Sequence, residues 1–317
     1  MAELKSLKNQ LQKREQSSLI PVATGLAHAQ SFGFFTDIPD SAWKIAQHLA
    51  AKTFPNEHQI QKYANGPNDK GKNSKLKYSS HWNGNNFQEE FHCAFAQRIP
   101  SSSLADGPKW ICDPHRIAAQ KSCLVYSVGS NGNTYFEDAV LNDVSADCEI
   151  HTFDVKSSNN MRNKDGSKGI DFKTALKGTS TFHHWGIGTE AQAARYSETR
   201  KGDPIKTVEQ TMKELGHTGR TIDIFKIDCE WCEWFTFESW LKADLRQILV
   251  ETHNAPMPNA QHFFHTLHDH GYVIFSKEAN YINGAGGVEF AFLKLDTSFF
   301  IEGTLYSDQT PNEKYVY

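Results

Sequence analysis

The sequence predicts an α/β fold with a mostly parallel, seven-stranded sheet that ends in a C-terminal β-hairpin. From residue 124 onward, short apolar runs alternate with helix-length segments, which is the pattern of βα units. The last two apolar runs are separated only by a loop that contains three glycines, which indicates a hairpin. With 317 residues, of which 38% are hydrophobic and 22% charged, the chain is long enough to bury a large core.

Seven strands are expected in chain order. Each is a short run of aliphatic, β-branched or aromatic residues, and a helix-length segment follows each of the first four. Strands joined in this way pair in parallel, whereas the final two pair in antiparallel fashion. The expected strands are residues 123–128, 149–155, 179–186, 222–228, 247–253, 272–276 and 288–295.

The first third of the chain has a different texture. Leucines at helical spacing predict a short surface helix within residues 1–16, and a second amphipathic helix is expected over 41–53 with Trp43, Ile45 and Leu49 facing inward. Residues 65–77 are poor in apolar side chains and predict an exposed loop. We therefore expect residues 1–100 to form a helical and loop-rich extension that packs on a catalytic domain of residues 101–317.

The charge balance narrows the range of partners. Lys and Arg total 33 against 37 Asp and Glu, so no broad basic face is expected and nucleic acid is not a predicted partner. No apolar run approaches the ~20 residues that span a bilayer, and residues 1–14 do not resemble a signal peptide. A cytoplasmic protein without a membrane partner is the expectation, unless an anchor precedes the given residues.

Six cysteines are spread through a long chain, which does not resemble a small disulfide scaffold, so reduced thiols are expected. Cys229 and Cys232 have the spacing of a zinc or redox pair. No second pair of this kind is present to complete a zinc site. Small residues at the end of a strand are therefore the favoured interpretation of this pair.

Ligands of open α/β sheets bind at the carboxyl ends of the strands, so the residues after each strand are the candidates. Gly129, Ser130 and Gly132 follow the first strand and would let a ligand approach the backbone. Asp154 ends the second strand, where a carboxylate can accept both hydroxyls of a ribose. The cofactor is thus predicted to contain an adenosyl group. The dinucleotide motif G-x-G-x-x-G is missing, which disfavours an NAD(P)-dependent oxidoreductase.

Acidic residues gather after the fourth and fifth strands: Asp228, Glu230 and Glu251, with His253 nearby. Such crowding is costly unless the groups share a proton, a cation or a substrate. His253, with an ordinary pKa near 6.5, or Asp228 would serve as a general base. A magnesium ion held by Asp228 with Glu251 or Asn254 is the less favoured alternative.

Longer segments carry a family resemblance. Residues 222–234, IDIFKIDCEWCEW, resemble a segment of FkbM-related methyltransferases. Residues 109–115, KWICDPH, followed by CLVYSVGSNG at 123–132, resemble the eukaryotic methyltransferase-domain family of the methyltransferase-like protein twenty-four type. Residues 182–188 and 247–253 are similar to later strands of that family. The resemblance extends from about residue 82 to 295.

The resemblance implies a Rossmann-like class I methyltransferase that uses S-adenosylmethionine. Gly129, Ser130 and Gly132 would then line the methionine part of the cofactor, Asp154 would bind the ribose, and Asp228 would lie near the sulfonium. Two positions depart from the family pattern. Ser127 stands where many class I enzymes have an acid, and Trp231 stands where a glycine is usual.

The predicted reaction is methyl transfer to a hydroxyl of a small molecule or glycan. Displacement at the sulfonium requires an aligned nucleophile and removal of its proton, and we assign these tasks to Asp228 and His253, with Glu230 beside them. One alternative is N-methylation of a protein side chain. Another is a non-catalytic protein that binds S-adenosylmethionine and serves as an interaction module.

Overall fold

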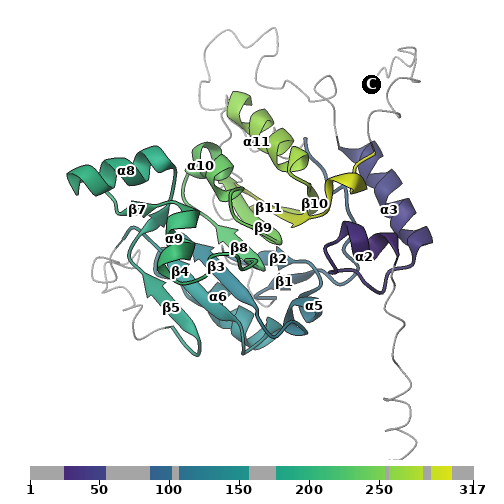
Figure 1. The fold of residues 1–317 in the computed structure, drawn as a ribbon, viewed down its shortest axis with the longest axis horizontal. Helices are drawn as coiled ribbons and strands as arrows, with labels where there is room; N and C mark the ends of the chain where they lie inside the picture. The colour runs from purple at the N-terminus through teal and green to yellow at the C-terminus, as the bar shows by residue number, and fades with distance from the viewer. Residues whose placement is uncertain are drawn as a thin grey trace, which may run out of the picture.

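The computed structural model describes residues 25–54, 86–101, 107–156, 176–253, 257–280 and 287–301. Its centre is a seven-stranded sheet in the order β10-β11-β9-β8-β3-β4-β5 (Figure 1). Five neighbouring strands run parallel, and β11 lies antiparallel to both β9 and β10. The strands are β3 (Leu124–Val128), β4 (Glu149–Phe153), β5 (Ser180–His183), β8 (Ile224–Ile227), β9 (Gln247–His253), β10 (Tyr272–Asn280) and β11 (Gly287–Lys294). The predicted fold class is confirmed.

Helices cover both faces of this sheet because the strands are apolar on both sides (Figure 1). Alternation along β3 sends Val125 to one face and Tyr126 to the other. The first face packs against α5 (Pro114–Ala118) and α6 (Tyr135–Ala139), which continues as a π-helical turn, Val140–Val144. The second face packs against α9 (Val208–Glu214), α10 (Glu233–Trp240) and α11 (Met257–Asp269).

The expected third strand is divided in two. After β5 the chain turns, with Trp185 N–H donating to His183 O at 3.0 Å. Residues Gly186–Ile187 then form β6, which leaves the main sheet and pairs with β7 (Ile205–Lys206). Helix α8 (Glu190–Thr199) connects these two short strands. The sequence does not show this turn, because the residues of the predicted strand, TSTFHHWG, carry no glycine, proline or asparagine at the position where the chain turns.

The amino-terminal elements lie beside the β10 edge of the sheet (Figure 1). They are α2 (Leu26–Gln30) and α3 (Asp40–Thr53). Trp43 of α3 is buried and donates from Nε1 to Gln30 Oε1 at 2.7 Å, while Gln30 Nε2 donates to Ser298 O at 2.8 Å, beside the 3-10 helix η4 (Thr297–Phe299). Ile45 and Leu49 are exposed, so their inward placement was wrong.

A hairpin and a disulfide connect residues on both sides of the expected domain boundary at residue 100. Strand β1 (Gln97–Ile99) pairs with β2 (Lys109–Ile111), and Cys93 is bonded to Cys112. The division into residues 1–100 and 101–317 stays a prediction. The expected helix within residues 1–16 and the loop at 65–77 lie outside the described residues.

All six cysteines form disulfides, so the expectation of reduced thiols was wrong. Cys93 pairs with Cys112, Cys123 with Cys148, and Cys229 with Cys232. The first two pairs join residues 19 and 25 positions apart, a proximity that only the folded chain creates. Among the helices that the structure describes, none has the length and apolar character needed to cross a membrane.

Candidate functional site

A cavity of about 330 Å³ opens where the carboxyl ends of β3, β4 and β8 meet. Its volume lies within the range of roughly 300–1,000 Å³ that is typical of small-molecule sites. Apolar side chains form much of its wall: Val128, Phe153, Val155, Ile187 and Ile205. Polar groups line the rest, including Gly129, Asn131, Asp154, Asp228 and Glu230. The residues predicted after three different strands are thus brought together.

The turn after β3 requires glycine. Gly129 has φ +75°, and a Cβ there would overlap the Asp228 carbonyl oxygen. Gly132 has φ +87°, also in the left-handed region. Asp154 holds this turn, because its Oδ2 accepts from the N–H of Ser130 at 3.1 Å and of Asn131 at 2.9 Å. The carboxylate therefore fixes the loop in addition to facing the cavity.

These residues fit the adenosyl cofactor that the resemblance implies. Oδ1 of Asp154 accepts one hydrogen bond, from Lys156 N–H at 2.8 Å, which leaves acceptor capacity for a ribose hydroxyl. The aliphatic and aromatic wall suits the flat adenine ring. Gly129, which has no side chain, brings the backbone of the turn to the cavity wall, and Asn131 lines the cavity beside it.

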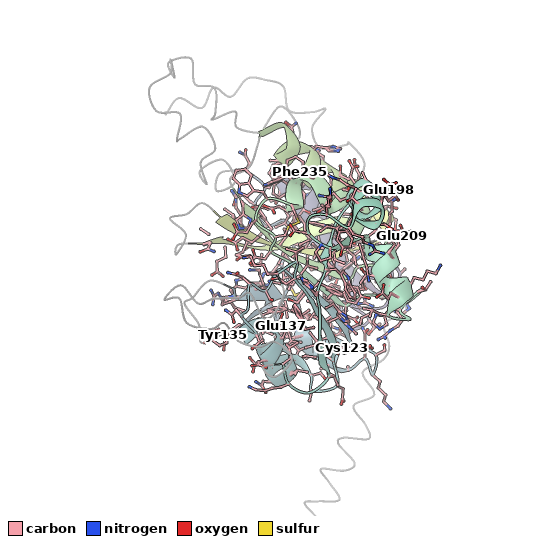
Figure 2. The ribbon with its side chains drawn as sticks, turned by 90° about the vertical axis from the view of Figure 1, so that its left-hand side faces the viewer. Cys123, Tyr135, Glu137, Glu198, Glu209 and Phe235 are labelled. Atoms are coloured by element: carbon pink, nitrogen blue, oxygen red, sulfur yellow. A yellow bond between two sulfur atoms is a disulfide. The ribbon has the colours of Figure 1, made fainter. Side chains whose placement is uncertain are left out.

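A second cavity of about 200 Å³ adjoins the first and shares Gly129, Asn131, Asp228 and Glu230 with it. Glu137 of α6 lines its depth and is buried, whereas Tyr135 at the start of the same helix is exposed (Figure 2). Burial raises the pKa of Glu137, although the charge of Lys226 opposes this rise. Glu137 thus places a carboxyl group near Ser127. Ser127 itself stands where many class I methyltransferases have an acidic residue.

The acidic residues of β8, β9 and β11 surround one buried lysine. Lys109 Nζ lies 2.7 Å from Glu289 Oε1 and 3.8 Å from Asp228 Oδ2. Burial opposes the charge of Lys109, but the charges of Glu289, Asp228 and Glu251 outweigh it and raise its pKa. Lys109 and Glu289 were missed by the sequence analysis because β2 and β11 bring them together from positions 180 residues apart.

The carboxyl groups in this cluster differ in their readiness to ionise. Burial, with the charges of Glu289 and Asp228, raises the pKa of Glu251 to about 8. Burial also acts on Asp228, but Lys226, Lys109 and His253 outweigh it and lower its pKa. Carboxylate oxygens of Asp228 and Glu251 lie within 4.8 Å of each other, and Asn280 Nδ2 donates to Glu251 Oε1 at 2.9 Å. One proton is therefore held on Glu251, next to an ionised Asp228.

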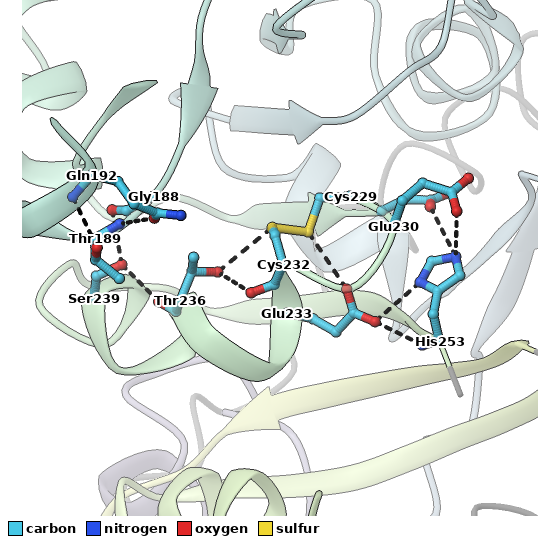
Figure 3. Close-up of a disulfide and its surroundings, with 11 residues drawn as sticks. Gly188, Thr189, Gln192, Cys229, Glu230, Cys232, Glu233, Thr236, Ser239 and His253 are labelled. Carbon is cyan, nitrogen blue, oxygen red and sulfur yellow. Dashed lines mark hydrogen bonds and ion pairs between the residues drawn. A yellow bond between two sulfur atoms is a disulfide. The ribbon is translucent and has the colours of Figure 1, made fainter. Parts of the chain in front are cut away.

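His253 lies between the carboxylates of Glu230 and Glu233 (Figure 3). Its Nδ1 lies 3.0 Å from Glu233 Oε1, and its Nε2 lies 3.7 Å from Glu251 and 3.8 Å from Asp228. Burial disfavours the charged ring, but the hydrogen bond to Glu233 and the neighbouring charges raise the pKa of His253 to about 9. The imidazole is thus protonated near neutral pH, which disagrees with a base of ordinary pKa at this position.

The turn after Asp228 is closed by the Cys229–Cys232 disulfide (Figure 3). The two residues inside it, Glu230 and Trp231, both have left-handed backbone conformations, with φ +55° and +89°. Trp231 keeps the conformation that a glycine would adopt without strain, and its side chain is 41% exposed. The disulfide and the fixed ends of the turn hold this strained geometry.

The proposed metal ligands are only partly supported by this geometry. Asp228, Glu251 and His253 offer ligand atoms within 4.8 Å of one another, whereas Asn254 lies outside the described residues. The ammonium group of Lys109 already lies between the carboxylates of Asp228 and Glu289. Its charge, together with protonated His253, opposes the binding of a second cation.

The sequence matches a known protein family. The model of this family, which is described as a methyltransferase domain, matches residues 25–294. No curated protein matches the sequence. Among solved structures, an rRNA methylase from Streptococcus thermophilus is 15% identical with a TM-score of 0.29, covering 58% of this chain and 96% of that one. The fibrillarin pre-rRNA processing protein of Methanococcus jannaschii is 8% identical with a TM-score of 0.31, covering 63% and 89%.

Proposed function

The chain belongs to a methyltransferase-domain family and is an S-adenosylmethionine-dependent methyltransferase, and we propose that its acceptor is a hydroxyl group of a small molecule or glycan. We also propose that it falls in the branch of the family, related to FkbM enzymes, that its segments at 109–132 and 222–234 resemble. The observation that carries the acceptor proposal is the pair of neighbouring carboxyl groups, Asp228 and Glu251, whose oxygens lie within 4.8 Å of each other where Asp228 lines the cofactor cavity.

The two adjoining cavities suggest how the cofactor is oriented. Adenine would occupy the larger, apolar cavity and the ribose would bind Asp154. The methionine part would extend along Gly129, Ser130 and Gly132 toward the second cavity, where buried Glu137 stands near Ser127. The sulfonium would then lie at the junction, beside Asp228 and Glu230, which line both cavities.

S-adenosylmethionine supplies the methyl group on its sulfonium, and the protein must align the acceptor and take its proton. Asp228 is ionised and lines the junction, so it can accept a hydrogen bond from the acceptor hydroxyl. The ionised Asp228 carboxylate takes the proton of the acceptor hydroxyl as the methyl group is transferred, and releases it to solvent afterwards. Glu251, whose pKa is raised to about 8, keeps its own proton and stands next to Asp228 as a neutral acid. His253, held by Glu233, contributes a positive charge that stabilises the ionised Asp228.

The three disulfides support a proposal about the cellular compartment in which the protein works. Protein disulfides persist in oxidising compartments and are rare in the cytosol. Because all six cysteines are paired, we propose that this protein works in an oxidising compartment, in place of the cytoplasm that the sequence analysis predicted. That neither nucleic acid nor a membrane is a partner stays a prediction.

A transfer assay tests the acceptor. The oxidised full chain would be incubated with methyl-labelled S-adenosylmethionine and separate panels of glycans, small hydroxylated molecules and proteins. We expect label in a hydroxyl-bearing small molecule or glycan. Asp228→Asn should lower kcat by about 10²–10⁴-fold, while binding of S-adenosylhomocysteine changes only a few-fold, because the lost group acts on the acceptor proton.

Glu238→Gln is the matched control, since Glu238 lies on the exposed side of α10 and, within the described part of the chain, pairs with His262 at the surface. Label found only on protein amines would replace the hydroxyl proposal with N-methylation. Cofactor binding without transfer to any panel would favour the non-catalytic alternative. Unchanged kcat in Asp228→Asn would remove Asp228 from the reaction.

A further inference from the structure

A second group of ionisable side chains lies on the sheet, at a distance from the cofactor cavity. Glu149 begins β4, roughly 13 Å of strand before Phe153 at the cavity wall. Its Oε1 lies 3.1 Å from His151 Nε2 and 3.0 Å from Nε2 of His217, which follows α9. One carboxylate oxygen and two ring nitrogens therefore converge on one point. The proposed methyl transfer uses none of them.

The other nitrogen of each ring has a partner of its own. His217 Nδ1 lies 2.8 Å from Tyr126 OH, and His151 Nδ1 lies 2.8 Å from His183 Nε2. When each Nδ1 carries the proton, it donates to that partner and leaves the Nε2 lone pair directed toward Glu149. Ligand histidines of metal sites show this arrangement, in which a hydrogen bond fixes the tautomer and the orientation of the ring.

Arg220 orients the Glu149 carboxylate. Its NH1 donates to Glu149 Oε2 at 2.6 Å, which fixes this oxygen and leaves Oε1 facing the imidazoles. His151 and His217 are buried, whereas the Glu149 side chain is 40% exposed. The point of convergence is thus enclosed on the protein side and reachable from solvent at Glu149, as an exchangeable ion requires.

We propose that Glu149, His151 and His217 bind a divalent transition-metal ion of the zinc class, with solvent as the fourth ligand. Zinc bonds to nitrogen and oxygen are about 2.0–2.2 Å long, so tetrahedral ligand atoms lie about 3.3 Å apart, close to the 3.0 and 3.1 Å observed. Two imidazoles and one carboxylate form a known zinc set, whereas magnesium and calcium favour oxygen ligands.

The bound ion would join three parts of the fold. It connects β4 to the loop between α9 and β8, and through the His151–His183 hydrogen bond it steadies the edge strand β5. The ring of His183 also stacks on Phe153, with centroids 5.0 Å apart, and Phe153 lines the cofactor cavity. The role of the ion is therefore structural, and it goes beyond the methyltransferase activity.

Metal binding can be measured directly on the untagged, oxidised full chain after removal of metals with a chelating resin. Titration with ZnCl₂ should show one saturable equivalent that Glu149→Gln removes. His217→Gln should remove it too, and Tyr126→Phe should weaken it by about 10-fold, because Tyr126 orients a ligand ring without touching the ion. Zinc should raise the Tm of the wild type but not of Glu149→Gln, since the ion binds the folded state.

Glu238→Gln is the matched control, because it removes a carboxylate that pairs with a single exposed histidine, His262, at 2.8 Å. It should bind zinc as the wild type does. The same equivalent and affinity in a folded Glu149→Gln protein would overturn the proposal and leave a metal-free hydrogen-bond network. Loss of the equivalent in Asp228→Asn instead would assign the ion to the acidic cluster and overturn it as well.

Discussion

The two halves of the strand-end site are built in different ways. At β3 and β4 the site consists of a glycine turn and Asp154, which are 22 to 25 residues apart and connected by hydrogen bonds to backbone N–H groups. At β8, β9 and β11 the site consists of charged side chains, with Lys109 among Asp228, Glu251 and Glu289. The first kind of site suits the cofactor role that we propose for it, and the second suits the proton transfer that we propose for Asp228.

The largest effect, on stability, is expected at the charged cluster of Lys109, Asp228, Glu251 and Glu289. Lys109→Met removes a buried cation and leaves the Glu289 carboxylate without its ion-pair partner, while Lys226 and His253 still compensate Asp228, so the free energy of unfolding should fall by about 3–5 kcal/mol. Urea denaturation under oxidising conditions measures this change. Lys294→Met removes a partly exposed partner of Asp244 and should cost less than about 1 kcal/mol. Equal losses in the two variants would show that the buried cluster has no special role.

The second-largest effect, on cofactor binding, is expected at Asp154 and the glycine turn. Asp154→Ala removes the acceptor of two backbone N–H groups and the expected ribose ligand, so the Kd of S-adenosylhomocysteine should rise about 100-fold, or about 2.7 kcal/mol. Isothermal titration measures it. Asp147→Ala, in an exposed turn before β4, should change the Kd little. A change of less than about 3-fold in Asp154→Ala would contradict the assigned cofactor orientation.

A smaller effect should appear as pH dependence. The folded pKa of Glu251, about 8, lies above its ordinary 4.5, and that of His253, about 9, lies above 6.5. Both groups bind a proton more tightly in the folded state. The stability due to Glu251 is complete below pH 4.5 and is lost as pH rises through about 8, and that due to His253 is complete below 6.5 and is lost through about 9.

The free energy of unfolding should therefore fall between about pH 4.5 and about pH 8 through Glu251 and between about pH 6.5 and about pH 9 through His253, by up to about 1.4 kcal/mol per pH unit for each proton. Glu251→Gln should reduce this slope, because its amide does not titrate, whereas Glu238→Gln should keep it. Denaturation curves at several pH values measure both slopes. An unchanged slope in Glu251→Gln would mean that Glu251 is not protonated in the folded protein.

The difference between the two halves of the site also explains which parts of the molecule could be predicted from the sequence. The strand positions and the βα pattern are local signals, so the seven-stranded sheet was predicted correctly, as were the glycine turn and Asp154 at the strand ends. Disulfide pairing was missed because it depends on distance in space. Cys123 and Cys148 directly precede the adjacent parallel strands β3 and β4, which makes the two cysteines neighbours. The pKa of His253 was misjudged because Glu233 reaches it from a different element, α10.

The sequence by itself determined the fold class and the position of the glycine turn and Asp154 at the strand ends, because alternating apolar runs, a glycine turn and a carboxylate at a strand end act over short distances along the chain. That these residues bind the cofactor stays a prediction. Only the tertiary structure decided the charged side. Lys109, Asp228 and Glu289 come from β2, the end of β8, and β11, and their charges are set by burial and mutual distance. The same holds for Glu149, His151 and His217, whose convergence requires the loop after α9 to pack on β4.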